Sequence, residues 1–309
     1  MFQQTTTSNN GPLNDELLKN QLIARYKPGR FVSTTNLYDT GRYGIVIPVH
    51  DSRTNTGYLL KAQKILDLFK PEFEVFKSMR EDSPFPHMVE HFGFFNPPNV
   101  FNYCIVMTVE GQSIQKLMAR TPTCWSIGNC VRLIYQLIGA VQALHNLGFC
   151  HRDIHFGNVT IKRESDQRLA VKLIDFNGAV RLDPPQHPIH VMTTWQASLQ
   201  VCEGMPYTRY DDLTSALFIL LKVRNIDPFP FGNVDQLKES KKSFDANPNV
   251  WFKADTMWIA ALYTQIQKQR ISGVDYNALF QMLETAVPGI NPQSDIDYQP
   301  TENNHIILL

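Results

Sequence analysis

Three polar residues at fixed intervals suggest metal-dependent chemistry on a hydroxyl group. Asp153 is followed five residues later by Asn158, and seventeen residues further on Asp175 ends a short apolar stretch. A carboxylate can orient and deprotonate an acceptor hydroxyl, while an amide oxygen and a second carboxylate are ligands that suit Mg²⁺. The spacing therefore predicts that Asp153 acts on the acceptor and that Asn158 and Asp175 bind Mg²⁺ beside a triphosphate.

Upstream, a pair of glycines and a lysine could hold that triphosphate. Gly41 and Gly44 would let main-chain amides approach phosphate oxygens closely, with Val46 on the strand that follows. Two glycines three residues apart are also typical of an ordinary hairpin turn. Lys61 lies on a second apolar segment, where a cation needs an anionic partner such as a phosphate or a carboxylate. We therefore predict that these four residues bind the nucleotide.

Glu72 is the candidate carboxylate partner of Lys61. It shares a helical face with Val75 and Phe76, and Pro71 predicts that the helix starts there, with Glu72 in its first turn. Two alternatives stay open: an ion pair with Lys61, or a carboxylate that remains in solvent.

The surrounding sequence predicts the elements that would position these side chains. Apolar strands at 44–49 and 58–61 flank a polar turn, which is typical of a hairpin. Two more strands are expected at 89–95 and 101–109. These segments would form a small, mostly antiparallel sheet.

After Gly111 the pattern changes from strands to helices. From Ile127 to Leu144 apolar residues recur at intervals of three and four, which predicts a long amphipathic helix. Short strands and further helices are expected beyond it (159–161, 171–174, 212–221, 258–268 and 276–284).

Together these elements predict an α+β fold of two lobes. A β-rich lobe would occupy residues 24–110 and a larger, mainly helical lobe residues 111–291, with a cleft between them. Polar segments at 1–20 and 292–309 are expected to be loose tails.

Composition narrows the classes of partner. The 309 residues carry no net charge and are 43% hydrophobic and 19% charged, which gives no support for a nucleic-acid or membrane-surface partner. The five cysteines lack metal-binding spacing, and no continuous apolar run reaches the roughly 18 residues of a membrane span. We expect a monomer with reduced thiols in the cytoplasm or the nucleus.

Three longer stretches make the chain similar to a known family. They read FNYCIVM at 101–107, LGFCHRDI at 147–154 and RYDDL at 209–213. They resemble protein kinases, and within these the casein-kinase-I superfamily, closest to its tau-tubulin kinase branch. The resemblance covers about residues 24–290. It implies a Ser/Thr protein kinase that uses ATP and Mg²⁺ on a protein substrate.

The resemblance also implies roles for further residues. Met107 would be the gatekeeper, and the next three residues would form the adenine-binding hinge (Thr108, Val109 and Glu110). Asp212 would anchor the loop that carries Asp153. Thr193 would steady the loop that contacts the substrate.

Four positions depart from the family pattern. Asp39 stands at the first glycine of the glycine-rich loop, and Trp195 replaces an anion-binding Arg of the substrate loop. Asn177 replaces the Gly after Asp-Phe, where Asn would readily accept a left-handed backbone. His155 replaces a Lys that helps to neutralise the γ-phosphate, a loss of about 10²–10³ in rate. His155 could act as an imidazolium, or stay neutral as in small-molecule kinases with the same D-x-H-x-x-N pattern.

The leading interpretation is an active Ser/Thr protein kinase, because all five polar groups needed for binding and transfer are retained (Lys61, Asp153, Asn158, Asp175 and Thr193). The alternatives are a pseudokinase that serves as a binding or scaffolding module and a small-molecule phosphotransferase.

Overall fold

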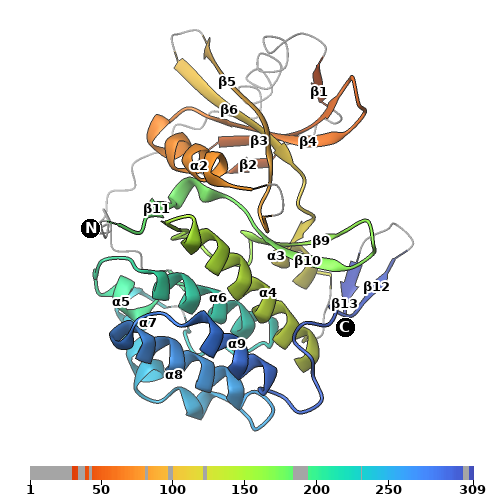
Figure 1. Cartoon of the computed structure of the whole chain (residues 1–309). Coiled ribbons are helices and arrows are strands. Elements are labelled where there is room, and N and C mark those ends of the chain that lie inside the picture. The colour runs from red at the N-terminus through yellow and green to blue at the C-terminus, as the bar shows by residue number, and fades with distance from the viewer. Residues whose placement is uncertain are drawn as a thin grey trace. The chain divides into compact units, whose positions relative to one another are not determined.

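The computed structural model describes residues 30–33, 39–41, 44–80, 83–96, 100–120, 124–183, 194–230, 232–301 and 306–309. The expected N-terminal tail and Thr193 lie outside these residues. The chain divides into two compact units (Figure 1). The first unit comprises the chain up to Phe73 and His87–Val109, and the second comprises Glu74–Pro86 and Glu110–Leu309.

The first unit is built on a six-stranded antiparallel sheet. Its strands run in the order β1-β3-β4-β6-β5, with β2 paired to β3. They are β1 (Phe31–Ser33), β2 (Asp39–Gly41), β3 (Gly44–Asp51), β4 (Gly57–Gln63), β5 (Met88–Asn96) and β6 (Val100–Thr108). The predicted hairpin and the two later strands are therefore confirmed.

Buried apolar residues alternate along these strands with residues on the opposite face, so one face of the sheet forms a core and the other carries Lys61. Buried residues of β3, β4 and β6 form one apolar cluster, which includes Ile45, Ile47, Val49, Leu60, Ala62, Cys104 and Val106. Side chains alternate between the two faces of a strand, so the residues between them point to the opposite side. Lys61 is one of these.

Helix α2 (Leu66–Ser78) starts earlier than the sequence suggested. The prediction that it begins at Pro71 is wrong, because the Phe69 amide already bonds to the carbonyl of Ile65. Pro71 lies inside the helix, where it removes one main-chain donor without ending the helix. Glu72 is therefore in the helix interior and not in the first turn.

The second unit is mainly helical (Figure 1). Its helices are α3 (Ile114–Met118), α4 (Ile127–Asn146), α5 (Leu199–Cys202), α6 (Arg209–Val223), α7 (Val234–Ala246), α8 (Met257–Ser272) and α9 (Tyr276–Glu284), with 3₁₀ turns η1 (Phe176–Gly178) and η2 (Pro248–Trp251). Its strands are β7 (Gln112–Ser113), β8 (Phe149–Cys150), β9 (Val159–Arg163), β10 (Leu169–Leu173), β11 (Val180–Arg181), β12 (Tyr298–Pro300) and β13 (Ile306–Leu308). The α+β, two-lobed fold class is confirmed.

Helix α4 runs through the core of this unit. Ser126 caps its first turn by accepting a hydrogen bond from the Asn129 amide. Its apolar stripe is buried against α6, β10 and α9. In the described part of the chain, α4 is the one helix whose length and composition would allow it to cross a membrane, but 56% of its most apolar stretch is buried, as in an ordinary core helix.

The prediction of a loose C-terminal tail is wrong for the described residues. Ile296, Ile306 and Leu308 are buried in the apolar core of the second unit. The side chain of Asn129 donates to the main-chain carbonyls of Asp297 and Leu309, both at 2.8 Å. Alternating apolar residues close to the end of the chain supply a strand, although the segment before them is polar.

Candidate active site

In the first unit, Lys61 and Glu72 form a buried ion pair. Nζ of Lys61 lies 2.8 Å from Oε1 of Glu72, which is 1% exposed. Nε2 of Gln63 donates to the other oxygen, Oε2, also at 2.8 Å. The carboxylate is therefore held at both oxygens, and the alternative of a solvated Glu72 is wrong. The interior position of Glu72 in α2 explains how eleven residues of separation allow this contact.

The residues predicted to contact nucleotide share the face of the sheet that carries Lys61. Val46 is paired with Lys61 across β3 and β4, and Lys61 is paired with Ile105 across β4 and β6. Residues directly opposite each other point to the same side, and so does Met107, two residues beyond Ile105. One face of the first unit therefore brings together Val46, Lys61 and Met107.

The two predicted glycines are the last residue of β2 and the first residue of β3. Gly41 is opposite Gly44 in the pairing of β2 with β3. A side chain at Gly44 would come within 2.3 Å of the carbonyl oxygen of Ala62, so the close approach of β4 already requires glycine there. The hairpin alternative and the phosphate-binding role are thus compatible. The side chain of Asp39 lies outside the described part of the structure.

Thr108 and Glu110, two of the predicted hinge residues, form side-chain contacts within their own units. The main-chain amide of Thr108 donates to the carbonyl of His87, and its hydroxyl accepts from the His87 amide at 2.8 Å. In the second unit, Glu110 is buried, and Oε2 accepts from Nζ of Lys162 on β9 at 3.2 Å. Val109 is exposed. The side chain of Glu110 therefore serves a local ion pair.

In the second unit, the carboxylate of Asp212 on α6 holds the loop after β8. It accepts hydrogen bonds from the main-chain amides of His151 (2.7 Å) and Arg152 (3.0 Å). It also lies 2.8 Å from Nε2 of His145 and from the Tyr207 hydroxyl. Burial opposes ionisation, but the hydrogen bonds from His145 and His151 keep the pKa of Asp212 below its usual value. The anchoring implied by the resemblance is confirmed.

His151 and Asn158 fix Asp153 from two sides. Nε2 of His151 lies 3.0 Å from the carbonyl oxygen of Ile174, so it carries the proton, and Nδ1 accepts from the Asp153 amide at 3.2 Å. The amide nitrogen of Asn158 donates to the carbonyl of Asp153 at 3.0 Å and lies 3.4 Å from its Oδ2. The amide oxygen of Asn158 is therefore the atom of this side chain that suits a cation.

Asp175 has an uncommon backbone conformation that contacts of its neighbours hold in place. The Ile174 amide donates to the carbonyl of Asn158 at 3.0 Å, which ties the two predicted metal ligands together. Asp175 has φ of 66° and ψ of 79°, a left-handed conformation that is rare outside glycine. The next residue, Phe176, is fully buried against Phe85 and the ring of His151. Such strain persists where packing fixes it, typically at functional sites.

The expectation that position 177 takes a left-handed backbone is wrong. Asn177 lies inside the right-handed 3₁₀ turn η1, and neither it nor Gly178 is among the residues with positive φ. The left-handed residue here is Asp175, two positions earlier. Replacing the family glycine by Asn therefore places no strain on the backbone.

His155 is turned back onto its own loop. Its Nδ1 accepts a hydrogen bond from the Gly157 amide at 3.0 Å, and its Nε2 lies 3.7 Å from Oδ2 of Asp153. Burial lowers the pKa of His155, against the opposing effect of the Asp153 charge. A side chain at Gly157 would come within 2.6 Å of the imidazole ring. Because Nδ1 accepts a hydrogen bond, it carries no proton. The ring is therefore neutral, with its N–H on Nε2, the nitrogen that faces Asp153.

The described part of the predicted substrate loop is tightly anchored. The indole N–H of Trp195 donates to Oδ1 of Asp227 at 2.9 Å, and Nζ of Lys222 lies 4.2 Å from the centre of the indole ring. Ser198 caps α5 and donates to Oδ1 of Asp211 at 2.6 Å. Trp195 therefore packs and hydrogen-bonds where an Arg would bind an anion.

Sequence reasoning missed Gln63 and Gly157. Gln63 lies two residues after Lys61 on the same strand, so the period of a strand already placed both side chains on one face. Gly157 gave no such signal, because its role depends on the orientation of the His155 ring.

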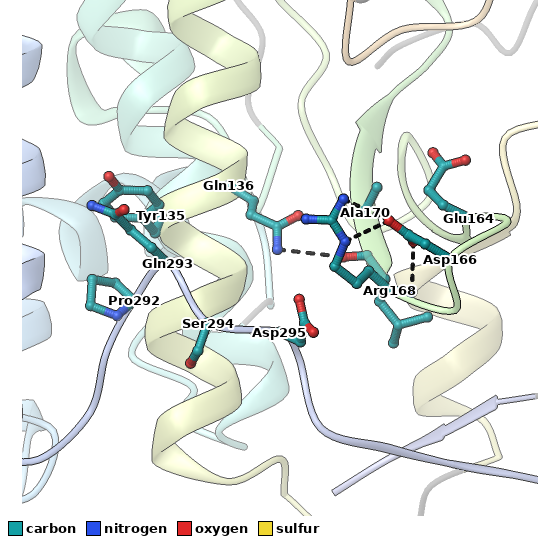
Figure 2. Close-up of a pocket in the computed structure, with 11 residues that line it drawn as sticks. Tyr135, Gln136, Glu164, Asp166, Arg168, Ala170, Pro292, Gln293, Ser294 and Asp295 are labelled. Atoms are coloured by element: carbon teal, nitrogen blue, oxygen red, sulfur yellow. Dashed lines mark hydrogen bonds and ion pairs between the residues drawn. The ribbon is translucent and has the colours of Figure 1, made fainter.

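A cavity of about 390 Å³ in the second unit is separate from these residues. Figure 2 shows its walls, which come from α4, the β9–β10 hairpin and residues 292–295. Its central polar groups bond locally: Arg168 pairs with Asp166, and Oε1 of Gln136 accepts from the Val171 amide. None of the residues predicted from the sequence lines it.

Comparison with known proteins agrees with this arrangement. The family model described as the protein kinase domain matches residues 39–270, which is more than half of the chain. The chain therefore belongs to the protein kinase family.

Several curated kinases are similar at low identity. Mitogen-activated protein kinase 12 of Rattus norvegicus is 27% identical over 215 residues, which cover 66% of this chain and 56% of that protein. Mitogen-activated protein kinase 12 of Danio rerio is 26% identical over 268 residues (82% and 69%). The probable serine/threonine-protein kinase zyg-1 of Caenorhabditis elegans is 26% identical over 205 residues (64% and 28%). The chain spans about half the length of the rat relative. These relatives do not confirm the casein-kinase-I branch, which stays a prediction.

Proposed function

We propose that this chain is an ATP-dependent protein kinase that transfers the γ-phosphate of ATP to a Ser or Thr hydroxyl of a protein. The observation that carries the proposal is the hydrogen-bonded loop after β8 in the second unit. In this loop, His151 and Asn158 hold Asp153 in place. A carboxylate oriented in this way can accept a proton from a hydroxyl group. The preformed Lys61–Glu72 pair supports the proposal from the first unit.

The donor set of the second unit fits Mg²⁺. Asn158 and Asp175 offer one amide oxygen and one carboxylate, and the hard Mg²⁺ ion prefers such oxygen ligands. Nδ1 of His155, a nitrogen of the same loop, is occupied by the Gly157 amide. We therefore assign Asn158 and Asp175 as Mg²⁺ ligands. The bound ion would neutralise charge on the triphosphate.

The remaining groups would act directly on the two substrates. Lys61, held by its ion pair with Glu72, would bind phosphate oxygens of ATP. Asp153 would take the proton of the acceptor hydroxyl as its oxygen forms a bond to the γ-phosphorus. The bond from the γ-phosphorus to the β–γ bridging oxygen breaks, and ADP leaves.

A catalytically silent binding module is the second candidate. The neutral His155 ring supplies no positive charge at the position where the family has Lys. Because electrostatic stabilisation is commonly the largest contribution to catalysis, such a loss favours slow transfer or none.

Calorimetric titration with ATP, with and without Mg²⁺, separates the two candidates when it is combined with a phosphate-transfer assay. For the kinase we expect Mg²⁺ to strengthen ATP binding, and Asp175→Ala to abolish that dependence. Asp153→Asn should keep ATP binding and lose about 10²–10⁴ in transfer rate. Mg²⁺-independent binding, or more than about a tenth of the transfer rate in Asp153→Asn, would contradict the proposal.

A further inference from the structure

Lys241, on α7, is a buried cation that has no acidic partner among the described residues. The residue is 2% exposed, and Nζ donates hydrogen bonds to the main-chain carbonyl oxygens of Trp195 (2.8 Å) and Ala197 (2.6 Å). Within the part of the chain that the structure describes, no carboxylate pairs with it, and the Cys202 thiol interacts with its charge. Such burial is unusual, because lysines inside proteins are nearly always paired with an acid.

Two aromatic rings complete the environment of this ammonium group. Nζ lies 4.1 Å from the centre of the Phe229 ring and 4.8 Å from that of Phe218. Ring faces attract cations, and the attraction grows when water is excluded. Lys241 is therefore held by the rings on one side and by two carbonyl groups on the other.

Other contacts fix two side chains of the same segment, 194–198, and one of its main-chain carbonyl groups. The indole of Trp195 bonds to Asp227, and Ser198 bonds to Asp211. The hydroxyl of Ser215 donates to the carbonyl of Gln196 at 2.9 Å. Lys241 alone among these groups takes two carbonyls, one on each side of Gln196, and so sets the course of the backbone.

We propose that Lys241 is a positioning residue that holds segment 194–198 as the surface against which the acceptor peptide of the protein substrate is placed. The inference rests on the proposed kinase function, since the segment is assigned to substrate contact by its resemblance to the substrate loop. As a buried residue, Lys241 would not itself contact nucleotide or the reacting hydroxyl. It acts through the carbonyls of Trp195 and Ala197.

The choice of Lys at this buried position fits positioning better than stability. A methionine of similar length would fill the space without the desolvation of a charge. It would, however, leave the carbonyl groups of Trp195 and Ala197 without this donor. Lys241 therefore supplies order to segment 194–198 at the expense of burying an ammonium group.

Hydrogen exchange and kinetics on Lys241→Met test this inference. The matched control is Lys242→Met, at a neighbouring lysine that pairs with Glu239 on the surface. In Lys241→Met we expect the amides of 195–202 to exchange at least about tenfold faster, with α4 and α6 unchanged. Lys242→Met should exchange like the wild type, and Lys241→Arg should restore part of the protection.

The kinetic readout uses the best acceptor found in a library of Ser/Thr peptides. Lys241→Met should raise KM for that peptide at least about fivefold, while KM for ATP and the slow hydrolysis of ATP without acceptor stay unchanged. A purely structural role would instead lower all activities together.

Each outcome decides a separate point. Unchanged exchange at 195–202 in folded Lys241→Met overturns the anchoring, and faster exchange with unchanged peptide KM overturns the positioning role. If the wild type transfers no phosphate to any peptide, the proposed function fails, while the exchange data still decide the anchoring. If Lys241→Met does not fold, exchange of 195–198 in the wild type at the rate of an unprotected chain overturns the proposal.

Discussion

The two units each contain a buried lysine, and the two lysines solve the same problem differently. Lys61 in the first unit is 8% exposed and faces the carboxylate of Glu72 at 2.8 Å. Lys241 in the second unit is 2% exposed and faces carbonyl groups and aromatic rings. A carboxylate neutralises a charge, whereas carbonyls and rings only replace part of its hydration.

The difference determines what each lysine leaves behind when it is removed. Without Lys61, the carboxylate of Glu72 stays buried with a net charge. Without Lys241, only neutral carbonyl groups lose a donor. The comparison therefore predicts that the first unit is the more sensitive to loss of its lysine.

The largest effect is expected for Lys61→Met. Removing one partner of a buried ion pair costs about 3–5 kcal/mol, and the remaining bond from Gln63 places this case at the lower end. Urea unfolding followed by circular dichroism measures the loss. The double variant Lys61→Met/Glu72→Leu should recover most of it, because no unpaired charge remains. A loss below about 1 kcal/mol would show that the pair is solvated.

The pH dependence of stability tests the other lysine. Burial lowers the pKa of Lys241 from 10.5 to about 8. Below pH 8 the group is protonated in the folded and unfolded chains, so the cost of burial is present in full. Between about pH 8 and 10.5 the unfolded chain keeps the proton that the folded chain releases, and the free energy of unfolding therefore rises.

We expect this rise to reach about 3 kcal/mol in the wild type relative to Lys241→Met, since each pKa unit corresponds to about 1.4 kcal/mol. Burial raises the pKa of Cys202 and the charge of Lys241 lowers it, so Cys202 is replaced by Ala in both proteins to remove its titration from the comparison. Urea unfolding at a series of pH values measures the difference. Parallel curves for the two proteins would mean that the ammonium is not desolvated.

A smaller effect is expected for Gln63→Leu. Gln63 donates a hydrogen bond to the Glu72 carboxylate, and losing such a donor to a buried charged acceptor costs about 1–3 kcal/mol. The loss should largely disappear in a Glu72→Leu background. An equal loss in both backgrounds would indicate a packing effect in place of the hydrogen bond.

The two lysines also mark what the sequence could and could not predict. Lys61 was predicted because strand pattern, glycines and a nearby acid all indicate one motif, and Asp153, Asn158 and Asp175 follow a similarly fixed spacing. Lys241 was not, because its partners are main-chain carbonyls, which no residue type encodes.

The same limit applies to whole elements. Helix α7 was missed because its buried positions, Leu237, Lys241 and Phe244, have a helical spacing that the central lysine disguises. The strands of the C-terminal segment were missed because a polar stretch precedes Ile306 and Leu308. Long helices such as α4 were predicted well, since their apolar stripe is continuous.

The smallest effect is expected at His155, the position where the family has a Lys. The Gly157 amide occupies Nδ1 and burial lowers the pKa, so the ring is neutral from pH 7 to pH 8. Phosphate transfer by the wild type should then show no fall as pH rises through this range. A His155→Lys variant should have a parallel profile, because a lysine also keeps one charge state in this range. Its rate should differ by only a few fold, because the gain of a positive charge is offset by loss of the Gly157 hydrogen bond that orients the side chain. A pH–rate series on both proteins at saturating Mg²⁺ and ATP measures this. If transfer by the wild type falls with rising pH while that of His155→Lys stays level, the imidazole is charged in the bound state, and His155 belongs with Lys61 among the groups that neutralise phosphate.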